Sequence, residues 1–299
     1  FGLLGVNGAG KTTTFKMLTG EEIPTVGTAS ILSYDSMHKK HKYLKEIGYC
    51  PQFDAIIDVL TGEEMLRLYA ALRGIPLHDM DSEVRNWIHI MGLDEFAKAQ
   101  CGTYSGGNKR KLSTAIALIG DPAVVFLDEP TAGVDPLSRR KLWDVLAQCQ
   151  RTGQAIVLTS HSMEECEALC SRLTILVGGH MKCIGTTQYL KQKFGQGYTI
   201  MIKLCPTFAD AGNALYALKE AVNRTFSNCF IKDEHKGLLH YHIADNTVLL
   251  SVLFSKLEEL RQSHPVVEDY TVGDTTLEQV FMSFAKQIPP LIVIEPVDV

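Results

Sequence analysis

Residues 5–12 constrain the fold of this chain more than any other segment, because they match the pattern GxxxxGK[ST]. Glycines in such a loop let backbone N–H groups curl around a phosphate, and the helix that follows adds its positive dipole end. An apolar strand pattern precedes the loop, and a helical pattern follows from Lys11 to Thr19, with Gly20 as a C-cap. These flanking elements argue against a Gly-rich structural turn and predict a phosphate-binding loop in an α/β domain. The expected phosphate contacts are Gly5, Asn7, Gly8, Gly10, Lys11, Thr12 and Thr13.

Two acids follow a second apolar strand, which we expect over residues 123–127. In a P-loop NTPase, an acid at this place joins the Mg²⁺ shell. A neighbouring carboxylate is then available as a general base for water. We therefore assign Asp128 to Mg²⁺, together with the hydroxyl of Thr12, and Glu129 to catalysis. Without the loop upstream, Asp128 would be interpreted as a capping residue at a strand end.

Length and charge favour a globular chain of two domains that does not bind nucleic acid. The chain has 299 residues, more than one core usually holds. Its net charge is −5 with Lys and Arg scattered among acids, whereas a nucleic-acid surface needs a basic stripe. No apolar run reaches the roughly 20 residues that a membrane span requires. Because the first residues already resemble a buried strand, we expect a truncated N-terminus with its neighbouring strands missing.

The first domain is expected over residues 1–195, as strands alternating with helices around a parallel sheet. A helical subdomain interrupts it over about 54–118: Thr61-x-x-Glu64 forms a capping box, and a second helix should begin at Ser82. Apolar residues, including Leu68 and Leu72, follow the capping box at helical spacing. The basic residues 109–111 either steer nucleotide or form a solvated helix face.

From residue 196 the pattern changes to strand, helix, strand, strand, helix, strand, followed by a last helix. The order βαββαβ is that of a ferredoxin-like sandwich. We therefore predict a small α+β domain over 196–290, with residues 291–299 as a tail. His240 and His242 fall on one side of a predicted strand, where we expect an exposed polar face rather than a metal site.

The segment Tyr104-Ser-Gly-Gly-Asn108, which precedes the second acidic strand, resembles the LSGGQ signature of ABC ATPases. The resemblance implies that Ser105, Gly106, Gly107 and Asn108 grip the γ-phosphate of ATP bound to a partner domain. Three further positions match the family order. Gln52 matches the Q-loop, which touches Mg²⁺ or water, Asp135 the D-loop, and His161 the switch histidine at the γ-phosphate. By itself, His161 would be interpreted as a helix-entry residue.

The amino-acid sequences of four segments are similar to those of the A subfamily of ABC transporters. In that subfamily, a Tyr and an Asn are usual at the signature positions of Tyr104 and Asn108. The similarity extends over nearly the whole chain and favours the C-terminal cassette, with the segment after Gly195 as its regulatory domain. The matching segments are 50–55, 104–113, 159–170 and 275–281. In the family, an aromatic residue that stacks on adenine lies upstream of the P-loop strand, so no adenine contact is assigned here.

This resemblance implies an enzyme that binds ATP and Mg²⁺ and hydrolyses ATP to power transport, as one cassette of a multi-pass membrane protein. Its expected partners are a second ABC cassette, transmembrane domains and a lipid substrate, with this part on the cytosolic face. Two alternatives stay open: a soluble ABC-type ATPase acting on ribosomes or nucleic acid, and a cassette that binds ATP without turnover. The cargo, the direction of transport and the organelle are not specified by these residues.

Overall fold

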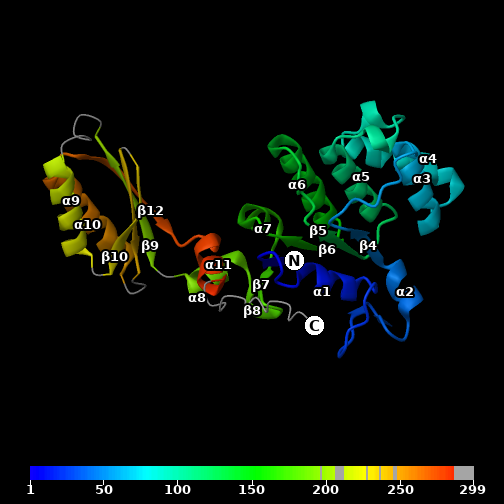
Figure 1. The fold of residues 1–299 in the computed structure, drawn as a ribbon, viewed down its shortest axis with the longest axis horizontal. Helices are drawn as coiled ribbons and strands as arrows, with labels where there is room; N and C mark the ends of the chain where they lie inside the picture. Colours follow the sequence, from blue (N-terminus) through cyan, green and yellow to red (C-terminus); the bar gives the residue numbers. More distant parts are fainter. Residues whose placement is uncertain (196, 206–211, 227, 236, 245–247, 286–299) are drawn as a thin grey trace, which may run out of the picture. The chain divides into compact units, whose positions relative to one another are not determined.

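The computed structural model describes residues 1–195, 197–205, 212–226, 228–235, 237–244 and 248–285. The chain forms two compact units, the first containing residues Phe1–Thr187 and the second Gln188–Gln287 (Figure 1). The division therefore falls before Gln188, whereas the change of pattern in the sequence places it after Gly195. The predicted tail over 291–299 lies outside the described residues. In the described part of the chain, no helix combines the length and the apolar character needed to cross a bilayer.

The first unit contains a six-stranded sheet in the order β4-β5-β6-β1-β7-β8. Neighbouring strands from β4 to β7 are parallel, which confirms the predicted parallel sheet, and β8 pairs with β7 through a hairpin. Burial on both faces explains why these strands are almost continuously apolar. The strands are β4 Ile47–Cys50, β5 Val124–Asp128, β6 Ala155–Ser160, β1 Gly2–Gly5, β7 Leu173–Val177 and β8 His180–Gly185.

Helices pack on this sheet through apolar side chains. Phe15, in the helix that follows β1, is fully buried and meets Phe126 of β5 edge-to-face at 5.3 Å between ring centroids. Such a contact adds to the free energy gained by burying both rings. The helices around the sheet are α1 Lys11–Leu18, α2 Lys40–Lys45, α6 Pro136–Arg151 and α7 Met163–Leu169, and a short hairpin pairs β2 Ser30–Ile31 with β3 Tyr34–Asp35.

The helical part of the first unit consists of α3 Gly62–Arg73, α4 Leu77–Ile90 and α5 Gly106–Leu118, with short 3₁₀ turns at Asp94–Phe96 and Cys101–Thr103. The capping box of α3 is confirmed, because the side chains of Thr61 and Glu64 bond each other's backbone N–H. The start predicted at Ser82 is wrong. Pro76 occupies the N-cap of α4, and the Ser82 hydroxyl instead donates to the Asp79 carbonyl inside the helix.

The buried stripe of α3 is narrower than its apolar pattern predicts. Met65, Leu66 and Ala70 are fully buried, but Leu68 is 39% exposed and Leu72 is 72% exposed. Helical spacing by itself therefore does not place these two leucines in the core. The reason is geometric, since Met65, Leu66 and Ala70 already cover the face that α4 and α5 contact.

The second unit holds a four-stranded antiparallel sheet in the order β10-β11-β9-β12, with α9 and α10 in the two crossovers. This arrangement agrees with the predicted ferredoxin-like order. Alternate residues of β9 and β11, such as Ile202 and Tyr241, enter the core. The elements are α8 Thr187–Phe194, β9 Tyr198–Leu204, α9 Gly212–Thr225, β10 Cys229–His235, β11 Leu238–Ile243, α10 Leu250–Ser263, β12 Val267–Asp274 and α11 Leu277–Ala285.

His240 and His242 lie on the face of β11 opposite to this core, as their alternation with Leu239 and Tyr241 requires. The prediction of an exposed polar face is nevertheless wrong for His242, which is only 9% exposed. Its ring packs against Phe230 of the neighbouring strand at 5.2 Å between ring centroids. The alternation of side chains along the strand identified the face on which His242 lies, but not the Phe230 ring that packs against it.

Candidate active site

The carboxyl ends of four neighbouring parallel strands bring the predicted residues to one edge of the sheet. The strand order β4-β5-β6-β1 places at that edge the segments that follow Cys50, Leu127, Ser160 and Leu4. The register agrees, because Cys50 lies opposite Leu127 and Leu4 lies opposite Ser160. This edge of a parallel sheet is where ligands bind in open α/β folds.

The phosphate-binding loop owes its shape to two glycines. A Cβ at Gly5 would lie 2.8 Å from the backbone oxygen of Leu176, so the loop leaves β1 too close to β7 for a side chain. Gly10 has φ 102°, a left-handed conformation that disfavours other residues. It forms the N-cap of α1 without a side-chain cap, and no acid lies in the first turn. The helix end is therefore available to an anion.

The Lys11 side chain folds back over this loop. It is 6% exposed, and its Nζ donates to the carbonyls of Gly5 at 2.8 Å and Val6 at 3.3 Å. The same ammonium lies 3.7 Å from Oε1 of Glu129. These contacts hold the buried ammonium between the phosphate-binding loop and the Glu129 carboxylate.

Glu129 lies between two other candidate residues, Lys11 and His161. Its Oε1 is 3.7 Å from Lys11 Nζ and 3.4 Å from Nδ1 of His161, whose side chain is 64% exposed. The Glu129 backbone has φ 50°, which is strained for a residue with a side chain. Thr159 fixes it by accepting the Glu129 N–H at its carbonyl, 3.2 Å, and at Oγ1, 3.0 Å. The carboxylate is thus aimed between a cation and an imidazole.

The surroundings of Asp128 suit a carboxylate that binds Mg²⁺. It is fully buried, and its Oδ1 accepts a hydrogen bond from the Thr159 hydroxyl, while its Oδ2 is buried without a hydrogen-bond partner. Such an orphaned carboxylate oxygen is the kind of donor that Mg²⁺ takes. Among the described residues, no group of three or more His, Cys, Asp or Glu could hold a metal ion. Of the other two residues assigned to Mg²⁺ from the sequence, Thr12 is half-buried and Gln52 is exposed.

The signature segment is anchored on one side and open on the other. The Tyr104 hydroxyl donates to the Phe96 carbonyl at 2.6 Å, and burial raises the pKa of this tyrosine to about 12. Ser105 caps α5 by accepting from the Asn108 N–H at 3.2 Å, and a Cβ at Gly107 would meet no atom within 4 Å. In the part of the chain that the structure describes, no hydrogen bond or ion pair joins residues 105–108 to the phosphate-binding loop.

Asp135 caps a helix rather than facing the loop. Its Oδ1 accepts from the Ser138 N–H at 2.9 Å, at the start of α6. This bond lowers the pKa of the exposed carboxyl below its ordinary value. The structure therefore brings together Lys11, Glu129 and His161, and leaves the signature and Asp135 apart from them.

Comparisons with known proteins agree with this arrangement. A family model for the ABC transporter matches residues 1–132, and a model for the ABCA1-like, C-terminal R1 regulatory domain matches residues 195–274. The human phospholipid-transporting ATPase ABCA3 is 51% identical over 97% of this chain, and the human retinal-specific phospholipid-transporting ATPase ABCA4 is 48% identical over 96% of it. This chain belongs to the A subfamily of ABC transporters.

The ABC cassette spans only part of such proteins, 17% of the length of ABCA3 and 12% of that of ABCA4. Its fold is also similar to a solved ATP-binding subunit of an ABC transporter, with a TM-score of 0.61 and 29% identity. That likeness covers 64% of this chain and 80% of the subunit. The P-loop NTPase fold with a helical subdomain, predicted from the motifs, is therefore confirmed.

Two residues that position this cassette's site were not identified from the sequence. Thr159 lies beside Asp128 in the pairing of β5 with β6, and that register cannot be deduced from the motifs alone. Arg110 is 2% exposed, so neither alternative for the basic residues 109–111 describes it correctly. A buried guanidinium in a basic run is recognisable only when the groups that surround it are known. Lys109, in contrast, is partly exposed and pairs with Asp58 at 2.7 Å.

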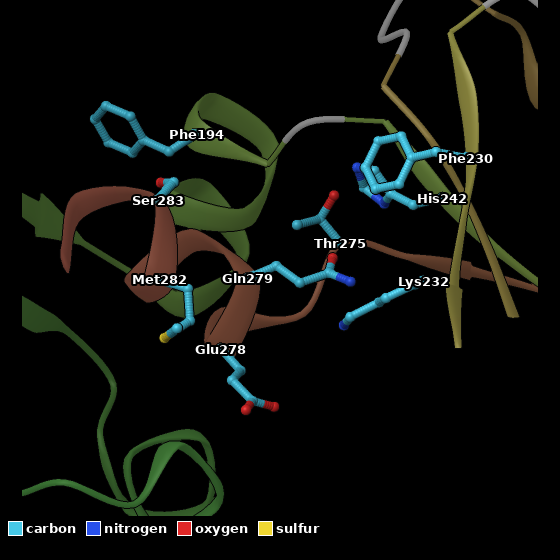
Figure 2. A pocket seen from close by; sticks show the side chains of 9 residues that line it. All are labelled: Phe194, Phe230, Lys232, His242, Thr275, Glu278, Gln279, Met282 and Ser283. Carbon is cyan, nitrogen blue, oxygen red and sulfur yellow. The ribbon is translucent and has the colours of Figure 1, made fainter. Parts of the chain in front are cut away.

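A cavity of about 520 Å³ lies in the second unit of the cassette. Figure 2 shows the side chains that line it, which come from α8 and α11, from strands β10 and β11, and from the turn between β12 and α11. No residue of the P-loop, of the two acids or of the signature contributes to it, so its size does not make it the site of ATP chemistry. It is lined by Phe194, Phe230, Lys232, His242, Thr275, Glu278, Gln279, Met282 and Ser283.

Proposed function

We propose that this cassette binds ATP with Mg²⁺ and hydrolyses it to power a transporter. The observation that carries the proposal is the Glu129 carboxylate, held within 3.7 Å of Lys11 and 3.4 Å of His161 beside the phosphate-binding loop. A base next to a cation and an imidazole, at the edge of a parallel sheet, suits attack of water on a terminal phosphate.

The roles follow from charge and position. Lys11 binds the β- and γ-phosphates, and the N–H groups of residues 5–13 bind the phosphate oxygens through the end of α1. Glu129 accepts a proton from the attacking water, and His161, exposed and within reach of the carboxylate, contacts the γ-phosphate. Mg²⁺, when bound, neutralises developing charge on the phosphates, with Asp128, Thr12 and Gln52 as its proposed protein ligands.

A second ABC cassette completes the site in this proposal. Ser105, Gly106, Gly107 and Asn108 lie at the start of a helix that has no acid in its first turn, and open space surrounds both glycines. They suit the γ-phosphate of ATP bound to the partner cassette, which explains why they do not contact this chain's own loop. Asp135 would lie at the same interface between the two cassettes.

The transporter context rests on the relatives. Because ABCA3 and ABCA4 bear the name of phospholipid-transporting ATPases, we propose that transmembrane domains of a multi-pass protein use this cassette to move lipid. The cassette would lie on the cytosolic face of the membrane, where ATP is available. We propose no nucleic-acid partner, because a net charge of −5 is unfavourable for binding to a polyanion.

The test uses the full-length protein that contains this cassette, with photoreactive azido-ATP to label the cassette and chromatography of the trapped nucleotide to report hydrolysis at this site. Lys11→Ala should lose labelling, whereas Glu129→Gln should keep it and slow hydrolysis by about 10²–10⁴-fold, the range for a lost general base. Arg151→Gln, at an exposed helix end, is the control. Full turnover by Glu129→Gln would refute the assigned base, and wild-type labelling without any ADP would identify a cassette that binds ATP without turnover.

A further inference from the structure

Arg110 occupies an unusual place for a cation in the signature helix α5. Its side chain is 3% exposed, and its guanidinium reaches two segments that are far apart in the sequence. On one side, Nη1 donates to the Pro51 carbonyl at 2.5 Å and to Oδ1 of Asp54 at 2.9 Å. On the other side, Nη2 donates to the carbonyls of Asp128 and Glu129, the latter at 2.9 Å, and Nε donates to the Pro130 carbonyl at 3.3 Å.

These contacts use the particular shape of a guanidinium. Arginine presents five N–H donors in a rigid planar fork, whereas lysine presents three donors on a flexible stem. Only the fork can hold three consecutive carbonyls of one segment and a carboxylate of another at fixed relative positions. A buried cation with one carboxylate partner and several carbonyls is also paired well enough to be tolerated.

The carbonyl side of this arrangement matters because the Glu129 backbone is strained. Its φ of 50° is a conformation that residues with a side chain avoid, and it persists only where surrounding bonds determine it. Thr159 holds the Glu129 N–H. Arg110 holds the Glu129 carbonyl and the two carbonyls that flank it. The orientation of the catalytic carboxylate therefore depends on contacts at both ends of one residue.

We propose that Arg110 is a positioning residue, which fixes the backbone of Glu129 and couples it to the segment 51–54 through Asp54. The proposal rests on the proposed ATP hydrolysis, because Arg110 acts through the backbone of Glu129. Movement of residues 51–54 would displace the guanidinium and with it the three carbonyls at the end of β5. The ion pair of Arg110 with Asp54 is thus the link between that segment and the general base.

The experiment compares Arg110→Lys with Arg151→Lys in the full-length protein, measuring kcat and KM for ATP, nucleotide affinity by azido-ATP labelling, and the thermal unfolding midpoint. Arg110→Lys keeps the charge and loses the fork, so kcat should fall by about tenfold to a hundredfold, the scale of a misplaced catalytic group. KM and nucleotide affinity should stay within about threefold, because Lys11 and the loop are untouched. Arg151→Lys should match the wild type in every measurement.

Asp54→Asn provides a second variant that does not depend on the folding of Arg110→Lys. It removes the charge at one end of the link and leaves the carbonyl contacts, so kcat should fall by a smaller factor. Combined with Arg110→Lys, it should cause no further loss, because both act through one contact. Wild-type kcat in either single variant, or a loss of affinity that equals the loss of kcat, would overturn the proposal. A wild-type cassette that forms no ADP would instead overturn the proposed function on which it rests.

Discussion

Replacing Thr159 by valine isolates the contribution of one hydroxyl to the site. Thr159 is fully buried, its hydroxyl donates to Oδ1 of Asp128, and the same oxygen accepts the Glu129 N–H at 3.0 Å. Valine is branched at Cβ like threonine, so the change mainly replaces the hydroxyl by a methyl group of similar size. The change removes the hydrogen bond that the hydroxyl donates to the buried Asp128 carboxylate. It also removes one of the two Thr159 oxygens that accept the Glu129 N–H.

The magnitude follows from these two bonds. A hydrogen bond to a charged group contributes about 1.5–3 kcal/mol to the free energy of unfolding. The second loss is small, because the Glu129 N–H keeps the Thr159 carbonyl, 3.2 Å away. We therefore expect Thr159→Val to lower the free energy of unfolding by about 2–3 kcal/mol. For a domain of about 150–250 residues this corresponds to a fall of roughly 5–10 °C in Tm.

The assay is thermal and urea unfolding of the purified chain, followed by circular dichroism. The matched control is Thr159→Ser, which keeps the hydroxyl and removes the methyl group, at a cost of about 1 kcal/mol for the small cavity. The valine variant should therefore be less stable than the serine variant. If serine proves the more damaging change, or if valine leaves the midpoint unaltered, the site is held by packing rather than by the hydroxyl.

Two further predictions test the fold. Gly48→Ala should severely destabilise the first unit, because the added Cβ would lie 1.9 Å from the Ala117 carbonyl oxygen. Gly107→Ala is the control and should unfold at the wild-type urea concentration, because no atom lies within 4 Å of its added Cβ. Equal unfolding midpoints for the two variants would contradict this prediction. Glu64 accepts hydrogen bonds from the Thr61 backbone N–H and hydroxyl, and these bonds lower the pKa of Glu64 below 4.5. The ionised carboxylate therefore stabilises the fold above pH 4.5. This contribution is lost as the pH falls through the lowered pKa. The stability difference between the wild type and Glu64→Gln, measured by urea titration, should shrink between pH 7 and pH 3, and a constant difference would refute this role.

Much of the active site could be predicted from the sequence because its chemistry is local. The spacing of Gly5, Gly10 and Lys11 specifies a loop and the start of a helix within eight residues. Asp128 and Glu129 follow directly from an apolar strand. The capping box of α3 was recognisable for the same reason, since Thr61 and Glu64 bond each other within one turn.

Contacts between distant segments could not be predicted. The ion pair of Arg110 with Asp54 joins residues 56 apart, and the bond from Thr159 to Asp128 joins residues 31 apart. A periodic pattern indicates which face of an element is apolar, but not which polar group is buried against another element. The start of α4, the exposure of Leu72 and the burial of Arg110 were therefore predicted incorrectly or not at all.

By itself, the sequence determined that this chain has a phosphate-binding loop, a strand ending in two acids, a signature segment and a second domain with βαββαβ order. Each of these is a property of neighbouring residues and of the periodicity of the chain. Only the tertiary structure decided that the strained backbone of Glu129 is held between Thr159 and Arg110, and that its carboxylate meets Lys11 and His161. That geometry depends on the register of parallel strands and on a buried side chain that crosses between segments, neither of which any local pattern specifies.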